Sequence, residues 1–271
     1  MNGAIFRKTF REALPLGLLL VLAILVFEML FVRAMSAFAN EITQMWFART
    51  GIRRLIQGMV GADLAEGLTP TGLITVGFGH PLLYAFTWTF LLTTCSRVIA
   101  AEVERGTADL LFTLPVSRPA IYTSVSLVWI LYGIPLSLAP WCGVWLGEHL
   151  TPLWEPIELG RLVPLTANLL GLYLAIGSAT LLVSSLASRR GPVIGVILAG
   201  LLGAFLINFL AQIWPAVQRL AFVGILHYYQ PLPVVRTGEW PIRNLVILLL
   251  IAVVAWALGL WQFNRRDIRA A

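Results

Sequence analysis

Charged residues are scarce in this chain: Asp, Glu, Lys and Arg make up 12% of its 271 residues, whereas apolar residues make up 59%. Soluble globular domains carry about 25% charged and about 45–50% apolar residues. A water-soluble particle of this size needs more polar surface than the sequence supplies. The scarcity of charge therefore excludes a soluble enzyme, a disordered regulator and a nucleic-acid-binding module, and it predicts an integral membrane protein.

Lysine and cysteine are also nearly absent. Lys8 is the single lysine, and no GxxxxGK[ST] sequence surrounds it, so the chain has no phosphate-binding loop with which to hydrolyse ATP. Cys95 and Cys142 lie in apolar stretches, where buried thiols are expected rather than a disulfide framework. The three histidines lie far apart, and no HExxH or GxSxG motif occurs. We therefore expect no metal site, no cofactor and no catalytic residue in this chain.

Long apolar runs dominate what is present. A helix needs about 20 apolar residues to cross the hydrocarbon core of a bilayer. Five stretches meet this requirement clearly, at residues 14–32, 119–146, 162–187, 193–214 and 242–263. A sixth stretch, 78–96, is richer in Thr but carries no charge and is expected to cross as well. The sequence predicts an all-α integral membrane protein with six transmembrane helices in a single transmembrane domain, residues 1–271.

The distribution of basic residues predicts the orientation. The two termini and the connections after the second and fourth spans are denser in Lys and Arg than the other three connections. The positive-inside rule places such segments in the cytoplasm. Both termini are then cytoplasmic, which requires an even number of spans and agrees with six. We expect a multi-pass protein of a bacterial or archaeal cell membrane, whose scattered arginines contact phospholipids and not nucleic acid.

Two of the outer connections are too long to be simple turns. Apolar residues at helical spacing predict an amphipathic helix over 52–60, which lies either in the outer headgroup layer or against the bundle. The apolar run 220–229 is too short to cross and has tryptophans and tyrosines close by. This run predicts a re-entrant or interfacial segment.

Few polar residues occur inside the spans. Glu28 lies in the first span, five residues before Arg33. It is either part of a translocation path or a carboxylate that reaches to the membrane interface. Asn208 and Gln212 in the fifth span are expected to face the protein interior or a water-filled path.

Small residues recur every four positions in two spans. Gly195, Ala199 and Gly203 follow this spacing in the fifth span, and residues 171–179 of the fourth span contain a similar series. Small residues at this spacing let helix backbones approach closely within a membrane. The series in the fifth span is either a seam between two copies of the chain or a packing face within one copy.

The cytoplasmic segment between the second and third spans is rich in charge. Glu102, Arg105 and Asp109 can pair on one helix face, because they lie three and four positions apart. An apolar flank accompanies them, and Pro115 ends the pattern. An amphipathic helix joined closely to two spans could transmit a displacement from a cytoplasmic partner. The alternative is an ordinary solvated loop helix.

This segment resembles the signature of ABC-2 type permeases, the membrane subunits of ATP-binding-cassette exporters. His80-Pro81 and the Phe263-NRRDI ending are similar to the same family. The positions of the segment that match the signature are Glu102, Glu104, Gly106, Thr107, Leu110, Leu111, Pro115, Ser117 and Arg118.

The resemblance implies a coupling helix over Glu102–Leu111, including Arg105, that docks on a separate ATPase subunit. That ATPase would bind ATP and Mg²⁺, and this chain would bind neither. Two permease copies and two ATPase subunits would form the exporter. ATP binding would move the coupling helices and drive the cargo across the membrane.

Two other functions fit the same residues. An ion-coupled secondary carrier or channel would use Glu28 and Asn208 along its path and would have no ATPase partner. A membrane-embedded enzyme or assembly factor would act on lipid or on a partner protein.

Overall fold

The computed structural model describes residues 1–48, 69–97, 116–153 and 155–265, without the side chains of 38–48. Within these ranges every regular element is a helix, and no strand occurs. The helices, in chain order, are α1 (Gly3–Ala48), α3 (Pro70–Phe78), α4 (Pro81–Arg97), α7 (Arg118–Leu150), α8 (Leu159–Leu186), α9 (Arg190–Ile213), α10 (Pro215–Gln218), η2 (Ala221–Val223), η3 (Ile225–Tyr228), α11 (Pro231–Thr237) and α12 (Ile242–Arg265).

Five helices of the described residues are long and apolar enough to cross a membrane: α1, α7, α8, α9 and α12. This confirms the predicted all-helical, multi-pass membrane protein. The sixth predicted span corresponds to α4, which has 17 residues and is at the short end of the range that crosses a bilayer. It begins at Pro81 and not at residue 78, because Gly79 and His80 separate it from α3.

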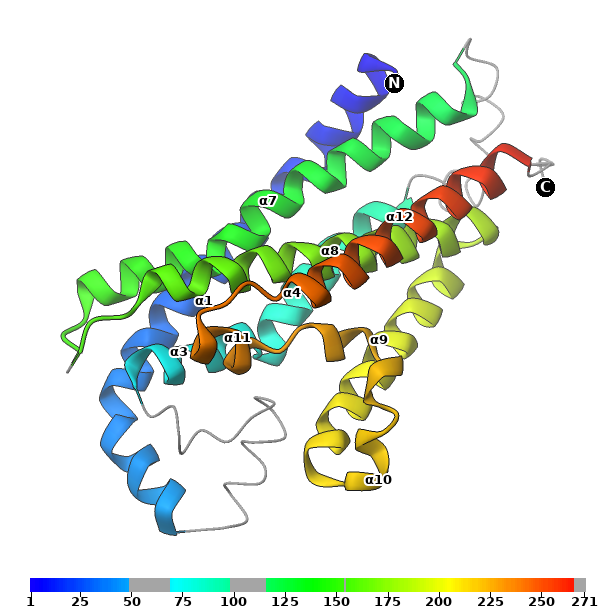
Figure 1. The fold of residues 1–271 in the computed structure, drawn as a ribbon. Coiled ribbons are helices and arrows are strands. Elements are labelled where there is room, and N and C mark those ends of the chain that lie inside the picture. Colours follow the sequence, from blue (N-terminus) through cyan, green and yellow to red (C-terminus); the bar gives the residue numbers. More distant parts are fainter. Residues whose placement is uncertain (49–68, 98–115, 154, 266–271) are drawn as a thin grey trace.

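Helix ends that are distant in the sequence meet at one end of the bundle, which we call the terminal end (Figure 1). The backbone N–H of Asn2 donates to Ser124 Oγ of α7 at 2.8 Å. Arg97 at the end of α4 lies 4.0 Å from Glu12 of α1. The preceding residue, Ser96, accepts a hydrogen bond from the first residue of α9 at 3.0 Å. The terminal end therefore joins α1, α4, α7 and α9.

A second set of contacts defines the opposite end, the far end. The N–H of Glu158, just before α8, donates to Thr71 Oγ1 of α3 at 3.0 Å. The hydroxyl of Tyr229, which follows η3, donates to the carbonyl of Phe78 at 3.0 Å. Along the chain α1, α4, α7, α8, α9 and α12 alternate in direction between the two ends. The N-terminus and the end of α12 both lie at the terminal end (Figure 1).

Two close helix pairs form most of the core. In the α1–α7 pair, a Cβ added at Gly143 would lie 2.5 Å from the carbonyl oxygen of Leu25, and Gly147 lies against Val32. In the α8–α12 pair, a Cβ added at Gly259 would lie 3.1 Å from the Cα of Leu182. These glycines let the backbones approach more closely than larger residues would allow.

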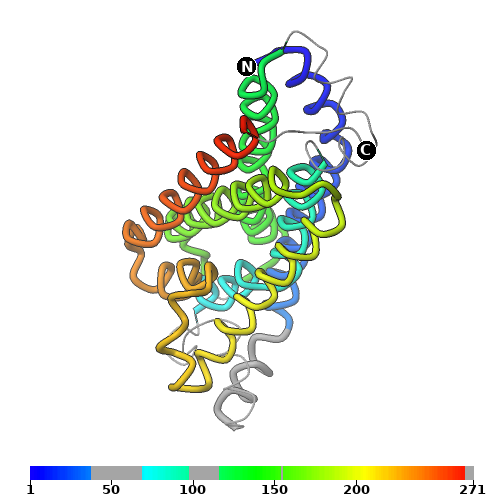
Figure 2. Tube along the Cα trace, turned by 90° about the vertical axis from the view of Figure 1, so that its right-hand side faces the viewer, coloured from blue at the N-terminus to red at the C-terminus, as the bar shows by residue number. Residues whose placement is uncertain are grey.

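Helix α9 diverges from the α8–α12 pair in both views (Figures 1 and 2). Its most apolar stretch is 17% buried, compared with 67% for α8. Several of its large apolar side chains are exposed, among them Val196, Leu202 and Leu206. One face of α9 is therefore free of protein within the described residues, and in a membrane it is covered by lipid or by another chain.

The first span is longer than the apolar run predicts. The sequence places it at 14–32, whereas α1 runs from Gly3 to Ala48. Charged residues such as Arg7, Glu12 and Arg33 are compatible with a helix, and no glycine or proline follows Gly17 to end it. The expected connection 33–77 thus begins with helix and ends with α3. The amphipathic helix predicted at 52–60 lies outside the described residues.

The segment between α9 and α12 folds back onto the bundle. It consists of α10, the two single turns η2 and η3, and α11. The region predicted as re-entrant or interfacial, 220–229, contains η2 and η3, and its last residue, Tyr229, is buried. The amide of Asn168 on α8 donates to the carbonyl of Tyr228 at 3.1 Å. This bond and the bond from Tyr229 to Phe78 anchor the segment at the far end.

Candidate functional site

The two flanks of the charged connection between α4 and α7 are anchored to other helices. On the α4 side, Ser96 bonds to Arg190 of α9, and Arg97 lies beside Glu12 of α1. On the α7 side, Arg118 Nη1 donates to the carbonyl oxygens of Phe263 and Asn264, both at 3.3 Å. A displacement of this connection would therefore act on α1, α9 and α12 as well as on α4 and α7.

Arg118 also meets an electrostatic requirement of α12. The last carbonyl groups of a helix have no partner within the helix and carry a partial negative charge. The guanidinium of Arg118 donates to two of these carbonyls and so holds the start of α7 against the end of α12. Ser117 is the N-cap residue of α7, but its side chain makes no capping hydrogen bond.

The other residues of the predicted coupling segment lie outside the described residues: Glu102, Glu104, Arg105, Gly106, Thr107, Leu110, Leu111 and Pro115. Of the positions that carry the resemblance in this segment, the structure thus places only Ser117 and Arg118. Both are at the terminal end.

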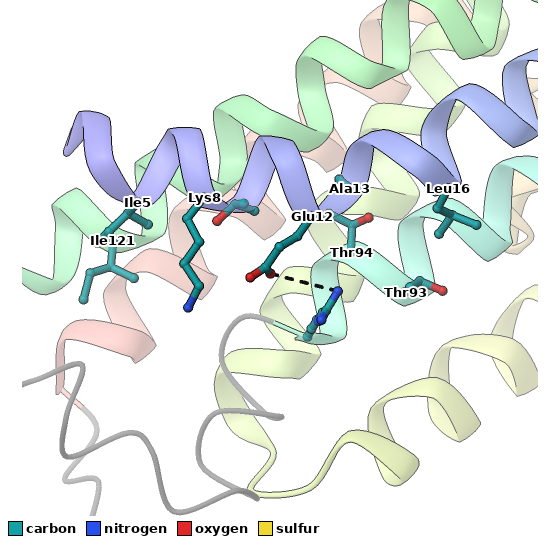
Figure 3. Close-up of a pocket in the computed structure, with 10 residues that line it drawn as sticks. Ile5, Lys8, Glu12, Ala13, Leu16, Thr93, Thr94 and Ile121 are labelled. Carbon is teal, nitrogen blue, oxygen red and sulfur yellow. Dashed lines mark ion pairs between the residues drawn. The ribbon is translucent and has the colours of Figure 1, made fainter.

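A cavity of about 140 Å³ opens at the terminal end between α1, α4 and the first turn of α7 (Figure 3). We call it the terminal cavity. Its charged residues are Lys8 and Glu12 of α1 and Arg97 of α4. Its remaining lining residues are Ile5, Thr9, Ala13, Leu16, Thr93, Thr94 and Ile121. The cavity therefore combines two cations, one carboxylate and three hydroxyl groups with apolar walls.

Glu28 is fully buried, with 0% of its surface exposed. Both carboxyl oxygens lack a hydrogen-bond partner among the described residues, and they lie against Gly77 of α3. Its Cβ would lie 2.8 Å from a Cβ added at Gly143 of α7. The interpretation of Glu28 as a carboxylate that reaches the interface is therefore wrong. A charged carboxylate without a partner is very costly in such surroundings, so this packing suits the neutral acid.

The other residues expected on a translocation path lie on α9. Asn208 and Gln212 are half-buried, and Asn208 Oδ1 is buried without a hydrogen-bond partner in the described residues. Glu28 packs against α3 and α7, so the structure places it among different helices.

The small residues of α9 are open. No atom lies within 4 Å of a Cβ added at Gly195 or Gly203, and Ala199 is exposed. Packing of this series within one chain is therefore excluded for the described residues. The similar series on α8 behaves differently, because a Cβ at Gly171 would contact Leu245 of α12 at 3.4 Å.

The described residues contain no group of His, Cys, Asp and Glu that could hold a metal ion. Cys95 is buried, Cys142 is half-buried, and neither forms a disulfide. Partial burial and, second, the positive charge of Arg243 lower the pKa of His227 from its ordinary value near 6.5. His227 is therefore largely neutral at pH 7.

Sequence reasoning missed the terminal cavity because its parts are far apart in the chain. Thr93 and Thr94 belong to the predicted sixth span, where the four threonines indicated only that this span is more polar than the others. Lys8 was considered only because no phosphate-binding loop surrounds it. The signal for α3 was more direct. Thr69 accepts a hydrogen bond from the N–H of Gly72, and Pro70 occupies the first turn, which is a common way to begin a helix.

The chain matches no model of a known protein family, and it has no significant match among curated proteins.

Proposed function

We propose that this chain is the membrane subunit of an ATP-driven exporter of the ABC-2 type. In this proposal α4 completes a set of six transmembrane helices, and both termini are cytoplasmic. The segment with Glu102, Glu104 and Gly106 binds a separate ATPase subunit, which supplies ATP hydrolysis. A second copy of the chain completes the path, and the open face of α9 around Gly203 forms the seam. The proposed site is a bacterial or archaeal cell membrane.

The observation that carries the proposal is the anchoring of the segment's two flanks. A coupling segment must transfer a small movement to the spans, and flexible joints between the segment and the spans would absorb that movement. Ser96 at the end of α4 is bonded to Arg190 of α9, and Arg118 is bonded to the last carbonyls of α12. A push on the segment would therefore move the cytoplasmic ends of several spans together. The resemblance of the segment indicates an ATPase as the partner. The anchoring explains how binding of that partner could move the spans.

The test compares binding with coupling. The chain is co-expressed and co-purified with ABC ATPase subunits from the same organism, and cargo-stimulated ATP turnover is measured in liposomes. Glu102→Ala and Glu104→Ala should weaken binding by roughly 30- to several-thousand-fold, because removal of one partner of a desolvated charge pair costs about 2–5 kcal/mol. Gly106→Leu should also prevent binding, because its side chain would hold the segment away from the ATPase surface.

Arg118→Gln tests the mechanical part. This variant should still bind the ATPase but should lose cargo-stimulated turnover, because the start of α7 is no longer held to α12. If the Glu102, Glu104 and Gly106 variants all bind and stimulate the ATPase like the parent, the exporter proposal is wrong.

A second candidate is an ion-coupled carrier, and the burial of Glu28 favours it. A buried carboxyl group without a partner in the described residues can bind and release a transported proton. Glu28→Gln should then abolish transport that depends on a proton gradient. In an exporter driven by ATP, the same variant should keep both ATPase binding and transport.

A further inference from the structure

Several donors of the terminal cavity have no partner among the described residues. Lys8 forms no ion pair within the described residues. Thr87 and Ser96 of α4 donate their hydroxyls to carbonyls one turn back. Thr93 and Thr94, on the same helix, form no side-chain hydrogen bond in the part of the chain that the structure describes. The cavity thus offers an ammonium group and hydroxyls to a ligand.

The charges favour an oxyanion. Arg97 is held by Glu12 only at 4.0 Å, with both side chains about 40% exposed, so the guanidinium retains donors for a ligand. Ammonium and guanidinium groups form their strongest hydrogen bonds with carboxylate and phosphate oxygens. Figure 3 shows Lys8 and Glu12 on the side of α1 that faces the end of α4, where Thr94 lies. Among the described lining residues one carboxylate faces two cations, so it reduces their net positive charge but does not cancel it.

The position of the cavity along α1 corresponds to the headgroup layer. Lys8 and Glu12 precede the apolar run that begins near residue 14, and the deeper wall is formed by Ala13 and Leu16. Basic side chains at the end of a transmembrane helix lie at the level of the lipid headgroups. A phosphate bound by Lys8 would therefore be at the depth that phospholipid phosphates already occupy.

A separate apolar groove lies between α4 and α9, one turn of α4 before the cavity. This α4–α9 groove has a volume of about 360 Å³, and it is lined by Trp88 and Leu92 of α4 and by Leu198, Leu202 and Phe205 of α9. Thr89 lines the groove and Thr93 lines the cavity. These residues are one turn apart, about 6 Å along the helix. A ligand with a phosphate and a hydrocarbon chain could occupy both spaces at once.

We propose that the terminal cavity and the α4–α9 groove bind one phospholipid. Lys8, Arg97 and the Thr93 and Thr94 hydroxyls bind its phosphate, and the groove receives one acyl chain. The groove favours a lipid over free phosphate as the ligand, because inorganic phosphate has no hydrocarbon chain that could fill an apolar groove. The bound lipid would hold the end of α4 to the sparsely packed helix α9. This inference does not depend on an ATPase partner.

The test measures the affinity of the purified, delipidated protein for phosphatidylglycerol by native mass spectrometry. A hydrogen bond to a charged group contributes about 1.5–3 kcal/mol, so Lys8→Gln should weaken binding by at least about tenfold. The matched control is Arg11→Gln, which removes a cation from the same helix without changing the cavity lining. It should change the affinity less than about twofold. Glu12→Gln should strengthen binding, because it removes the repelling carboxylate and releases Arg97.

The groove has its own variant and its own control. Leu202→Trp should fill the groove and weaken lipid binding, whereas Leu206→Trp, which is exposed on α9 outside the groove, should not. Inorganic phosphate at millimolar concentration should fail to displace the lipid. Equal losses in the Lys8 and Arg11 variants would overturn the inference. So would displacement by inorganic phosphate, or lipid binding that is unchanged in Leu202→Trp.

Discussion

At the scale of single residues, the environment of Glu28 is set by two glycines. Gly77 and Gly143 leave space that the carboxyl group and its Cβ occupy, and the side chain has no exposed surface. A buried polar atom without a hydrogen bond costs about 1–3 kcal/mol. Glu28 therefore reduces the stability of the fold, which is typical of a residue that is kept for another purpose.

We predict that Glu28→Met stabilises the protein. The methionine side chain has a similar length and no hydrogen-bonding groups that need a partner. The free energy of unfolding of the variant should therefore be about 1–3 kcal/mol higher than that of the parent. The matched control is Glu148→Met. Glu148 Oε1 accepts a 2.7 Å hydrogen bond from the N–H of Ile157, so this variant should be less stable. Thermal unfolding in detergent measures both, and a lower midpoint for Glu28→Met would contradict the prediction.

The sequence could not predict the burial of Glu28. The nearby Arg33 favoured a side chain that reaches the interface, and that interpretation considers α1 alone. Burial depends on α3, which is nine residues long and too short to be recognised by its apolar length. Arg118 is the opposite case. The resemblance singled it out from the sequence, and the structure adds its bonds to the end of α12.

At the scale of helices, the glycines of α7 and α9 have opposite surroundings. Gly143 of α7 lies close to the backbone of α1, whereas a Cβ at Gly200 of α9 would meet nothing within 4 Å. The same substitution should therefore have different effects on the two helices. This contrast separates helix pairing from the intrinsic preference of a residue for helix.

We predict that Gly143→Ala destabilises the protein by about 1–3 kcal/mol, because the new methyl group would force α1 and α7 apart. Gly200→Ala should be neutral or stabilise by up to about 1 kcal/mol, since alanine favours a helix more than glycine does. Denaturant titration of both variants in the same detergent gives the comparison. An equal loss of stability in the two variants would show that α1 and α7 are not in contact at Gly143.

Apolar runs located the centres of the long helices well and their ends poorly. The runs at 162–187 and 242–263 agree closely with α8 and α12, because both helices end where the apolar residues end. The run at 14–32 misses much of α1. An apolar run shows which part of a helix lies in lipid, but it does not show where the hydrogen bonding of the helix ends. The sequence also could not assign a face to the small residues of α9, because their spacing is the same in both interpretations.

At the scale of the whole molecule, the chain runs repeatedly between the terminal end and the far end. Basic residues concentrate at the terminal end, near the starts of α1, α7 and α9 and the end of α4, where Arg7, Lys8, Arg97, Arg118 and Arg190 lie. The positive-inside rule relates this concentration to the cytoplasmic side. The structure adds that segments distant in the sequence meet at this end of the bundle.

We predict that a membrane-impermeant thiol reagent added outside intact cells labels cysteines placed at Pro152 and Thr237, at the far end. The same reagent should not label a cysteine at Arg189, at the terminal end, until the membrane is opened. The measurement uses a parent in which Cys95 and Cys142 are replaced by serine. Labelling at Arg189 from outside would reverse the orientation, and labelling at all three positions in intact cells would refute the membrane path itself.

Helix α1 has a consequence for the shape of the particle in a membrane. Its 46 residues make it about 69 Å long at 1.5 Å per residue. Even at a steep tilt of about 40° it would rise about 53 Å, whereas a bilayer with its headgroups is about 40–45 Å thick. The apolar run ends at residue 32 and the helix continues to Ala48, so most of the excess length stands beyond the far end. A molecule that approaches the protein from that side would contact the projecting end of α1 before it reached the membrane surface.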